Sequence, residues 1–186
     1  MPADRTRVAA LLRGINVGGG NRVPMAELRE LLDGLGCAEV VTYLQSGQAV
    51  FVPPVGVRAT AAGRSGLAVT LEAALKERFA LDLRVRVTDL DEVERVVAGN
   101  PFAKAAEDHT RVHGVFLERV PDVAALERLR AATKEPNECV VSGAVAYLHY
   151  PIGLHAKPVP IERALGMWAT ARNWRTVLKL QELLAD

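Results

Sequence analysis

The order of strand-like and helix-like segments constrains the fold of this chain more than any single motif. Short apolar runs bounded by charges, glycine or proline are typical of strands, and apolar residues spaced by three or four are typical of helices. In the first half these patterns predict strands at residues 8–12, 40–44, 49–52 and 83–87, with helices at residues 24–35 and 67–79. The order β-α-β-β-α-β is that of a ferredoxin-like sandwich.

The same order of elements recurs in the second half. Strands are expected at residues 112–120, 138–141, 145–150 and 168–171, with helices at residues 122–129, 160–166 and 173–184. Thr88 and Asp91 resemble a capping box, which would open a linker helix that ends near Val97. We therefore predict an α+β protein of two ferredoxin-like halves joined by a linker helix, with a C-terminal helix. The expected domains are residues 1–88, a linker at 89–110, and residues 111–186.

Composition limits the classes of partner. The chain has 186 residues, of which 49% are hydrophobic, and its formal net charge is only +1. Such a chain can bury a core but has no global attraction to nucleic acid or to acidic membranes. Cys37 and Cys139 lack zinc-ligand spacing, and the first apolar run is too short for a signal peptide or a membrane span. We expect a cytoplasmic protein with reduced cysteines.

The segment between Arg13 and Arg22 is the strongest candidate for a binding site. It links a strand to a helix N-terminus and contains four glycines and two asparagines, residues that readily adopt positive φ. We predict an anion-binding loop in which the backbone N–H groups of residues 18–20 contact the ligand, Asn16 fixes the loop, and the arginines supply charge. The alternative is a strained connection that simply needs glycine. The candidate ligand-binding residues are Arg13, Asn16, Gly18, Gly19, Gly20 and Arg22, with Ser46 and Arg172 as further members.

This segment does not match the common nucleotide-binding fingerprints. A Walker loop counted from Gly14 would need lysine and a hydroxyl residue where Gly20 and Asn21 stand, and a dinucleotide-binding turn would need a small residue at Val23. Nucleotide hydrolysis is therefore disfavoured. His109 and His113 are spaced four residues apart, but they lie in a loop that enters a strand and so would not share a helical face. We therefore predict no metal site, and we also predict no cofactor.

Ser46 and Arg172 are weaker candidates. Ser46 lies in a turn and lacks the flanking glycines of a nucleophile elbow, so a role in the turn is favoured. Arg172 precedes Asn173, a predicted helix N-cap, where its guanidinium could meet an anion. We expect Trp174 to anchor the final helix on the core.

Four segments carry a resemblance to a known family: residues 11–19, 42–47, 100–102 and 170–177. In these segments the chain resembles a bacterial family catalogued as domain of unknown function 1697, which implies two ferredoxin-like halves and supplies no activity. Two departures are Gln48, where the family usually has asparagine, and residues 153–159, which lose two hydroxyl side chains of the family pattern.

The leading hypothesis is a protein that binds a small ligand or anion, such as one containing phosphate. A metal-independent transferase or hydrolase is an alternative, although no nucleophile–base pair is evident. An interaction or scaffold module that forms a homodimer through exposed sheet faces is another. Aromatic residues make up 5% of the chain, which argues against a general RNA-binding module but leaves binding of a short or modified oligonucleotide open.

Overall fold

The computed structural model describes residues 6–16, 20–153 and 158–186. The chain divides into two compact units. Unit 1 comprises residues up to Val93 together with Leu180–Asp186, and unit 2 comprises Glu94–Lys179. The domain boundaries expected from the sequence, at residues 88 and 111, stay a prediction.

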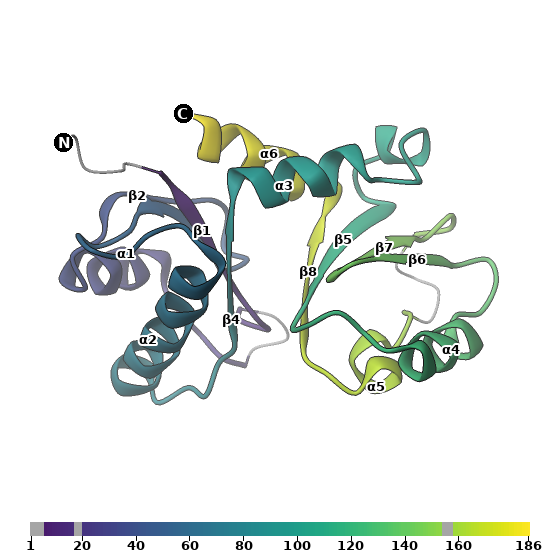
Figure 1. Ribbon diagram of the computed structural model, residues 1–186, viewed down its shortest axis with the longest axis horizontal. Coiled ribbons are helices and arrows are strands. Elements are labelled where there is room, and N and C mark those ends of the chain that lie inside the picture. The colour runs from purple at the N-terminus through teal and green to yellow at the C-terminus, as the bar shows by residue number, and fades with distance from the viewer. Residues whose placement is uncertain (1–5, 17–19, 154–157) are drawn as a thin grey trace. The chain divides into compact units, whose positions relative to one another are not determined.

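Unit 1 contains one four-stranded antiparallel sheet with the strand order β2-β3-β1-β4. Figure 1 shows α1 and α2 on one face of this sheet. Strand β1 is central because it pairs with both β3 and β4, for example Ala10 with Ala49 and with Val87. The elements of this sandwich are β1 (Val8–Leu12), α1 (Met25–Gly34), β2 (Ala38–Thr42), β3 (Gln48–Val52), α2 (Ala61–Phe79) and β4 (Val85–Asp89).

The core of unit 1 follows from the apolar periodicity of its helices. Leu28 and Leu32 lie one turn apart on α1, and Leu67, Leu71 and Leu75 form a stripe on α2. These side chains are buried against alternate residues of the strands. Burial of one apolar face of each helix holds the helices on the sheet.

Unit 2 repeats this architecture with the strand order β6-β7-β5-β8. Its helices α4 and α5 lie on one face of the sheet (Figure 1), and their buried residues join one cluster with alternate strand residues. The α+β fold predicted from element order is confirmed. The elements are β5 (Val112–Leu117), α4 (Val123–Ala132), β6 (Glu138–Ser142), β7 (Val145–His149), α5 (Ile161–Leu165) and β8 (Ala169–Asn173).

Three further elements complete the described chain: α3 (Leu90–Ala98), the 3₁₀ turn η1 (Ala105–Glu107) and α6 (Trp174–Ala185). Asn173 Oδ1 accepts a hydrogen bond from Thr176 N (2.9 Å), so the predicted cap of α6 is confirmed. Trp174 is buried and its ring centroid lies 6.5 Å from that of Tyr147, which confirms its anchoring role. No helix among the described residues is long and apolar enough to cross a bilayer.

The predicted capping box of α3 is wrong by one residue. Asp89, not Thr88, accepts the hydrogen bond from Glu92 N, at 2.9 Å from its Oδ1. Thr88 belongs to β4, and its hydroxyl donates to Glu92 Oε2 (3.0 Å). Strand pairing of Thr88 with Ala9 continues up to the start of the helix, which moves the cap to the next residue.

Candidate functional site

The loop after β1 is held in place by the side chain of Asn16. Its Nδ2 donates to the carbonyl oxygens of Val23 (2.9 Å) and Gln45 (2.8 Å), and its Oδ1 accepts from Val23 N (3.0 Å). Asn16 has φ +55°, a conformation that asparagine tolerates better than most residues. One amide therefore ties the loop both to the start of α1 and to the turn between β2 and β3, as the sequence predicted for Asn16.

The same two loops are also packed tightly through Gly47. This residue has φ +75°, and a Cβ placed on it would lie 2.6 Å from Ile15 Cγ1. Ile15 is 2% exposed, so its side chain fills the space that a larger residue at position 47 would need. Glycine at this position thus allows the β2–β3 turn to close over the loop after β1.

An open hollow of about 590 Å³ lies beside these loops, and we call it the α1 hollow. Its wall includes the first turn of α1, where Pro24 occupies the N-cap position without a side-chain cap. The first N–H groups of a helix have no partner within the helix and carry its positive dipole end. The lining residues are Asn16, Arg22, Val23, Pro24, Met25, Ala26, Arg29, Thr42, Leu44 and Gln45.

Two arginines make the α1 hollow cationic. Arg22 is exposed and forms no hydrogen bond or ion pair with the described part of the chain. Arg29 Nη1 donates to Thr42 Oγ1 (2.6 Å), which orients its guanidinium across the hollow's wall. The nearby acidic residue Glu27 lies 3.3 Å from Arg78 in an ion pair, so part of its charge is already balanced.

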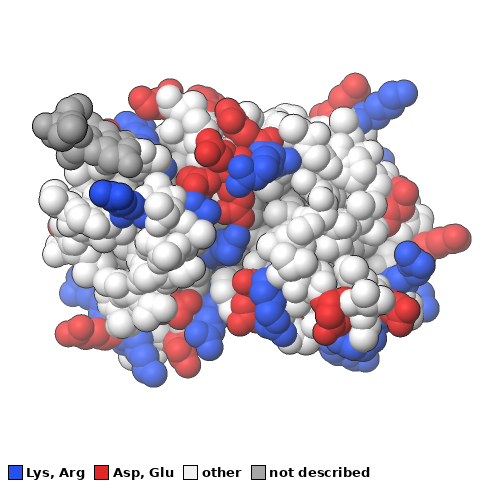
Figure 2. Space-filling view, in the orientation of Figure 1, with Lys and Arg blue, Asp and Glu red and all other residues white. Residues whose placement is uncertain are grey.

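The wider surface gives the hollow no strong electrostatic support. On the face that Figure 2 shows, Lys and Arg side chains are interspersed with Asp and Glu side chains. The chain carries 23 basic and 22 acidic residues. Attraction of an anion to the α1 hollow must therefore come from local groups and not from a broad positive surface.

Of the remaining residues of the predicted loop, the two that the structure describes, Arg13 and Gly20, do not line this hollow. Gly18 and Gly19 lie outside the described residues, and Gly20 is exposed. Arg13 does not line the hollow; its backbone N donates to the carbonyl oxygen of Arg84 (2.9 Å), which precedes β4. Arg13 and Arg22, which flank the loop in the sequence, thus do not line a common hollow.

Ser46 is exposed in the β2–β3 turn and does not line the α1 hollow. No described imidazole or carboxylate forms a hydrogen bond with its hydroxyl.

Burial raises the pKa of the Cys37 thiol to about 11, with a further contribution from Asp33, and raises that of Cys139 to about 12. Both thiols are therefore protonated near neutral pH, which makes them poor nucleophiles.

Arg172 lies on β8 in unit 2 and is buried, with 6% of its surface exposed. Its Nη1 donates to Thr170 Oγ1 and to the Ala171 carbonyl oxygen, both at 2.8 Å. Burial lowers the pKa of this guanidinium to about 10. Its position within β8, rather than in a loop before the cap, removes Arg172 from the surface that a ligand could reach.

Three residues that line the α1 hollow, Arg29, Thr42 and Leu44, were not predicted as site residues from the sequence. Arg29 reads as an ordinary solvated residue of an amphipathic helix, and Thr42 as the end of a strand. Leu44 stands out only in the structure, where its side chain is 54% exposed and its backbone has φ +56°. Such a backbone conformation is uncommon for a bulky residue and marks positions that are held by their surroundings.

Comparison with known proteins identifies relatives of uncharacterised activity. A sequence model of a family described as "Protein of unknown function (DUF1697)" matches residues 5–147. The solved structure described as "The structure of conserved bacterial protein SP0830 from Streptococcus pneumoniae" is similar, with a TM-score of 0.72 and 25% identity over 96% of this chain and 98% of that chain. A search of curated proteins gave no match. Because the family match spans most of the sequence, this chain belongs to the DUF1697 family.

Proposed function

We propose that unit 1 binds a small phosphate-containing anion in the α1 hollow. The observation that carries the proposal is the position of Arg22, a cation without a partner among the described residues, beside the uncapped first turn of α1. An anion there would accept hydrogen bonds from the helix N–H groups and from Arg22 at once. Helix N-termini with nearby arginines are suited to phosphate groups for this reason.

Arg29 supports the same ligand class. Its guanidinium is oriented by Thr42 and has further donors besides the Nη1 that makes this bond. A planar guanidinium can contact two oxygens of one phosphate, which distinguishes phosphate from a monovalent halide. Asn16 keeps the loop and the helix start at fixed positions, so little ordering entropy would be lost on binding.

The size of the α1 hollow favours a phosphate ester over inorganic phosphate. A volume of about 590 Å³ is in the range of small-molecule sites and exceeds what a single phosphate group fills. Leu44 also lines the hollow and offers exposed apolar surface there. An organic substituent on the phosphate could pack against Leu44 while the phosphate contacts the arginines.

Isothermal titration with inorganic phosphate and with a panel of phosphate monoesters tests this proposal. We expect at least one monoester to bind more tightly than phosphate, and Arg22→Ala or Arg29→Ala to weaken its binding about tenfold each. Arg130→Ala, at an exposed position of α4 in unit 2, is the matched control. The proposal fails if no member of the panel binds, or if the two hollow variants bind as tightly as the control.

The variant Arg13→Ala separates this site from the loop predicted from sequence alone. The arginine of an anion-binding loop formed by residues 13–22 should be needed for binding, whereas Arg13 does not line the α1 hollow. We therefore expect Arg13→Ala to retain binding. Loss of binding in Arg13→Ala with retention in Arg29→Ala would favour the loop over the α1 hollow.

A further inference from the structure

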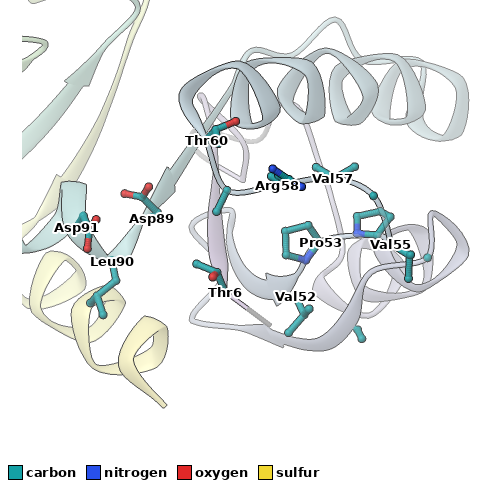
Figure 3. A pocket seen from close by; sticks show the side chains of 15 residues that line it. Thr6, Val52, Pro53, Val55, Val57, Arg58, Thr60, Asp89, Leu90 and Asp91 are labelled. Carbon is teal, nitrogen blue, oxygen red and sulfur yellow. The ribbon is translucent and has the colours of Figure 1, made fainter. Parts of the chain in front are cut away.

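Unit 1 has a second open hollow, of about 850 Å³, at the opposite end of its sheet. The α1 hollow lies where β1 and β2 end, whereas this second hollow lies where they begin and where β3 and β4 end. Its outer wall is the connection between β3 and α2, residues 53–60, so we call it the 53–60 hollow. Figure 3 shows this hollow with its lining side chains.

The 53–60 connection contains a turn and is attached to α2 at its C-terminal end. Val57 N donates to the Pro54 carbonyl oxygen (3.0 Å), which closes a turn through Gly56 at φ +92°. Arg64 Nη1 donates to the Ala59 carbonyl oxygen (2.5 Å), and the backbone at Arg58 approaches Gly63 so closely that an added Cβ would lie 2.0 Å from the Arg58 oxygen. The wall is therefore held by the start of α2.

The same connection borders a hollow on each of its two sides. A further hollow of about 400 Å³ lies between it and α2, and Pro54, Gly56, Val57, Arg58 and Thr60 line both hollows. Val55, at the tip, is 99% exposed. A loop that is held by a helix and exposed at its tip is a common carrier of binding groups.

The charged groups of the 53–60 hollow are divided between two walls. Figure 3 shows Arg58 on the 53–60 connection and, across the hollow from it, Asp89 at the end of β4 and Asp91 in the first turn of α3. Asp89 is neutralised by an ion pair with Arg64, whose side chain is 16% exposed. Arg58 and Asp91 are exposed, and neither has a hydrogen bond or ion pair with the residues that the structure describes.

The wall that carries Arg58 also carries the start of α2. Thr60 caps this helix by accepting from Gly63 N (3.2 Å), which leaves the N–H groups before Gly63 without partners in the helix. This wall favours a negative group, and the wall of Asp91 favours a positive one. Apolar side chains also line the hollow, among them Val52, Pro53 and Leu90.

We infer that the 53–60 hollow binds a short apolar peptide whose two termini are both free. The peptide carboxylate would contact Arg58 and the first turn of α2, its ammonium group would contact Asp91, and its side chains would pack on Val52 and Pro53. A single α-amino acid carries its ammonium and carboxylate groups on the same carbon atom, whereas each added residue extends the span between the two charges by about 3.3 Å. The volume of the hollow accommodates a tripeptide.

Titration of the full chain with the tripeptide Ala-Val-Ala tests this inference. We expect saturable binding that weakens about tenfold when the peptide is N-acetylated or C-amidated, because each change removes one charged terminus. Arg58→Ala should weaken binding of the free peptide to a similar degree, and so should Asp91→Asn. Free valine should bind more weakly than the tripeptide, and equal binding of valine would overturn the proposed peptide length.

A double-mutant cycle assigns each terminus to its partner. Acetylation of the peptide should cost nothing further in Asp91→Asn, and amidation should cost nothing further in Arg58→Ala. Asp82→Asn, an exposed change outside the hollow, is the control for the loss of an acidic group. Undetectable binding of Ala-Val-Ala, or additive effects in both cycles, would overturn the inference. Arg22→Ala should bind the peptide normally, so failure here is distinguishable from failure of the phosphate site.

Discussion

Asn16 joins three segments of unit 1 through one amide group. Its three hydrogen bonds connect the loop after β1 with the start of α1 and with the β2–β3 turn. Asn21 is a natural comparison, because it also has positive φ, at +46°, but makes one side-chain bond, from Nδ2 to the Gly14 carbonyl oxygen (3.2 Å). The two asparagines differ in bonding more than in backbone conformation.

We expect Asn16→Ala to lower the free energy of unfolding by about 2–4 kcal/mol, since it removes three hydrogen bonds and places alanine at positive φ. Asn21→Ala should cost about 1 kcal/mol. Urea denaturation of both variants measures the difference. Equal losses would show that backbone conformation, and not the amide bonds, decides the stability of this loop.

The role of Asn16 could be predicted from the sequence, whereas the set of arginines around it could not. Asparagine among glycines is typical of a turn that needs positive φ and local hydrogen bonds. Arg29 enters the α1 hollow because Thr42, thirteen residues later, ends a strand beside it. That proximity is a property of the folded sheet and leaves no local pattern. The strand expected to end at residue 171 continues to Asn173, which places Arg172 within β8 and buries it.

His113 gives unit 2 a specific dependence on pH. Its ring packs edge-on against Tyr150 with centroids 5.6 Å apart, and its buried Nδ1 has no hydrogen-bond partner among the described residues. Burial lowers its pKa from the ordinary value of 6.5. The unfolded chain therefore binds a proton more readily than the folded chain just below that pH.

As the pH falls through about 6.5, the free energy of unfolding should decrease, because protonation of His113 favours the unfolded state. Above that pH both states hold the neutral imidazole, and this contribution vanishes. The variant His113→Phe keeps an aromatic ring and should flatten the decrease. Denaturation curves between about pH 5 and pH 8 measure it. An unchanged slope in His113→Phe would assign the effect to other groups.

Helix α2 contains two glycines whose surroundings differ. A Cβ on Gly63 would lie 2.0 Å from the carbonyl oxygen of Arg58, whereas a Cβ on Gly66 would meet nothing within 4 Å. Both are inside the same helix, so helix propensity predicts the same benefit from alanine at each. The contrast therefore isolates the close approach of the 53–60 connection.

We expect Gly66→Ala to raise the free energy of unfolding by up to about 1 kcal/mol. Gly63→Ala should lower it by about 1–3 kcal/mol, because a backbone atom must move to admit the methyl group. Thermal melts of the two variants provide the measurement. A stabilising Gly63→Ala would mean that the connection shifts freely, which would also weaken the case for a fixed wall of the 53–60 hollow.

At this scale the sequence predicted the elements better than their ends. The stripe of Leu67, Leu71 and Leu75 fixes α2 because few other arrangements bury all three. The start of α3 depends on where the β4 ladder stops, and that is set by pairing with β1 far away in the sequence. The residue types of Thr88 and Asp91 suggested a capping box, but β4 extends through Thr88, and Asp89 therefore caps the helix.

Over the whole molecule, two units share one strand order although their sequences show no evident repeat. Unit 1 is not a continuous stretch of chain, because it includes Leu180–Asp186. Arg7 links this segment to the rest of unit 1: its Nη1 donates to the Leu183 carbonyl oxygen (3.2 Å), and its Nη2 lies 2.8 Å from Glu39. Leu180 and Leu184 of the segment are buried.

Removal of residues 180–186 should destabilise unit 1 by about 3–6 kcal/mol, the loss expected for two buried leucines. Hydrogen exchange should show faster exchange at the amides of β1 than in the intact chain, with a smaller change in β5. Removal of only Ala185 and Asp186, both exposed, is the control. Unchanged protection of β1 in the longer deletion would contradict the assignment of this segment to unit 1.

The division of unit 1 also sets an order of events during translation. The ribosome synthesises Leu180–Asp186 after every residue of unit 2. Unit 1 is therefore incomplete in the nascent chain while unit 2 is being synthesised. Unit 2, which is contiguous, can finish folding first even though its residues are synthesised later than most of unit 1. A premature stop before Leu180 would therefore release a chain with one finished half and one half open to proteolysis.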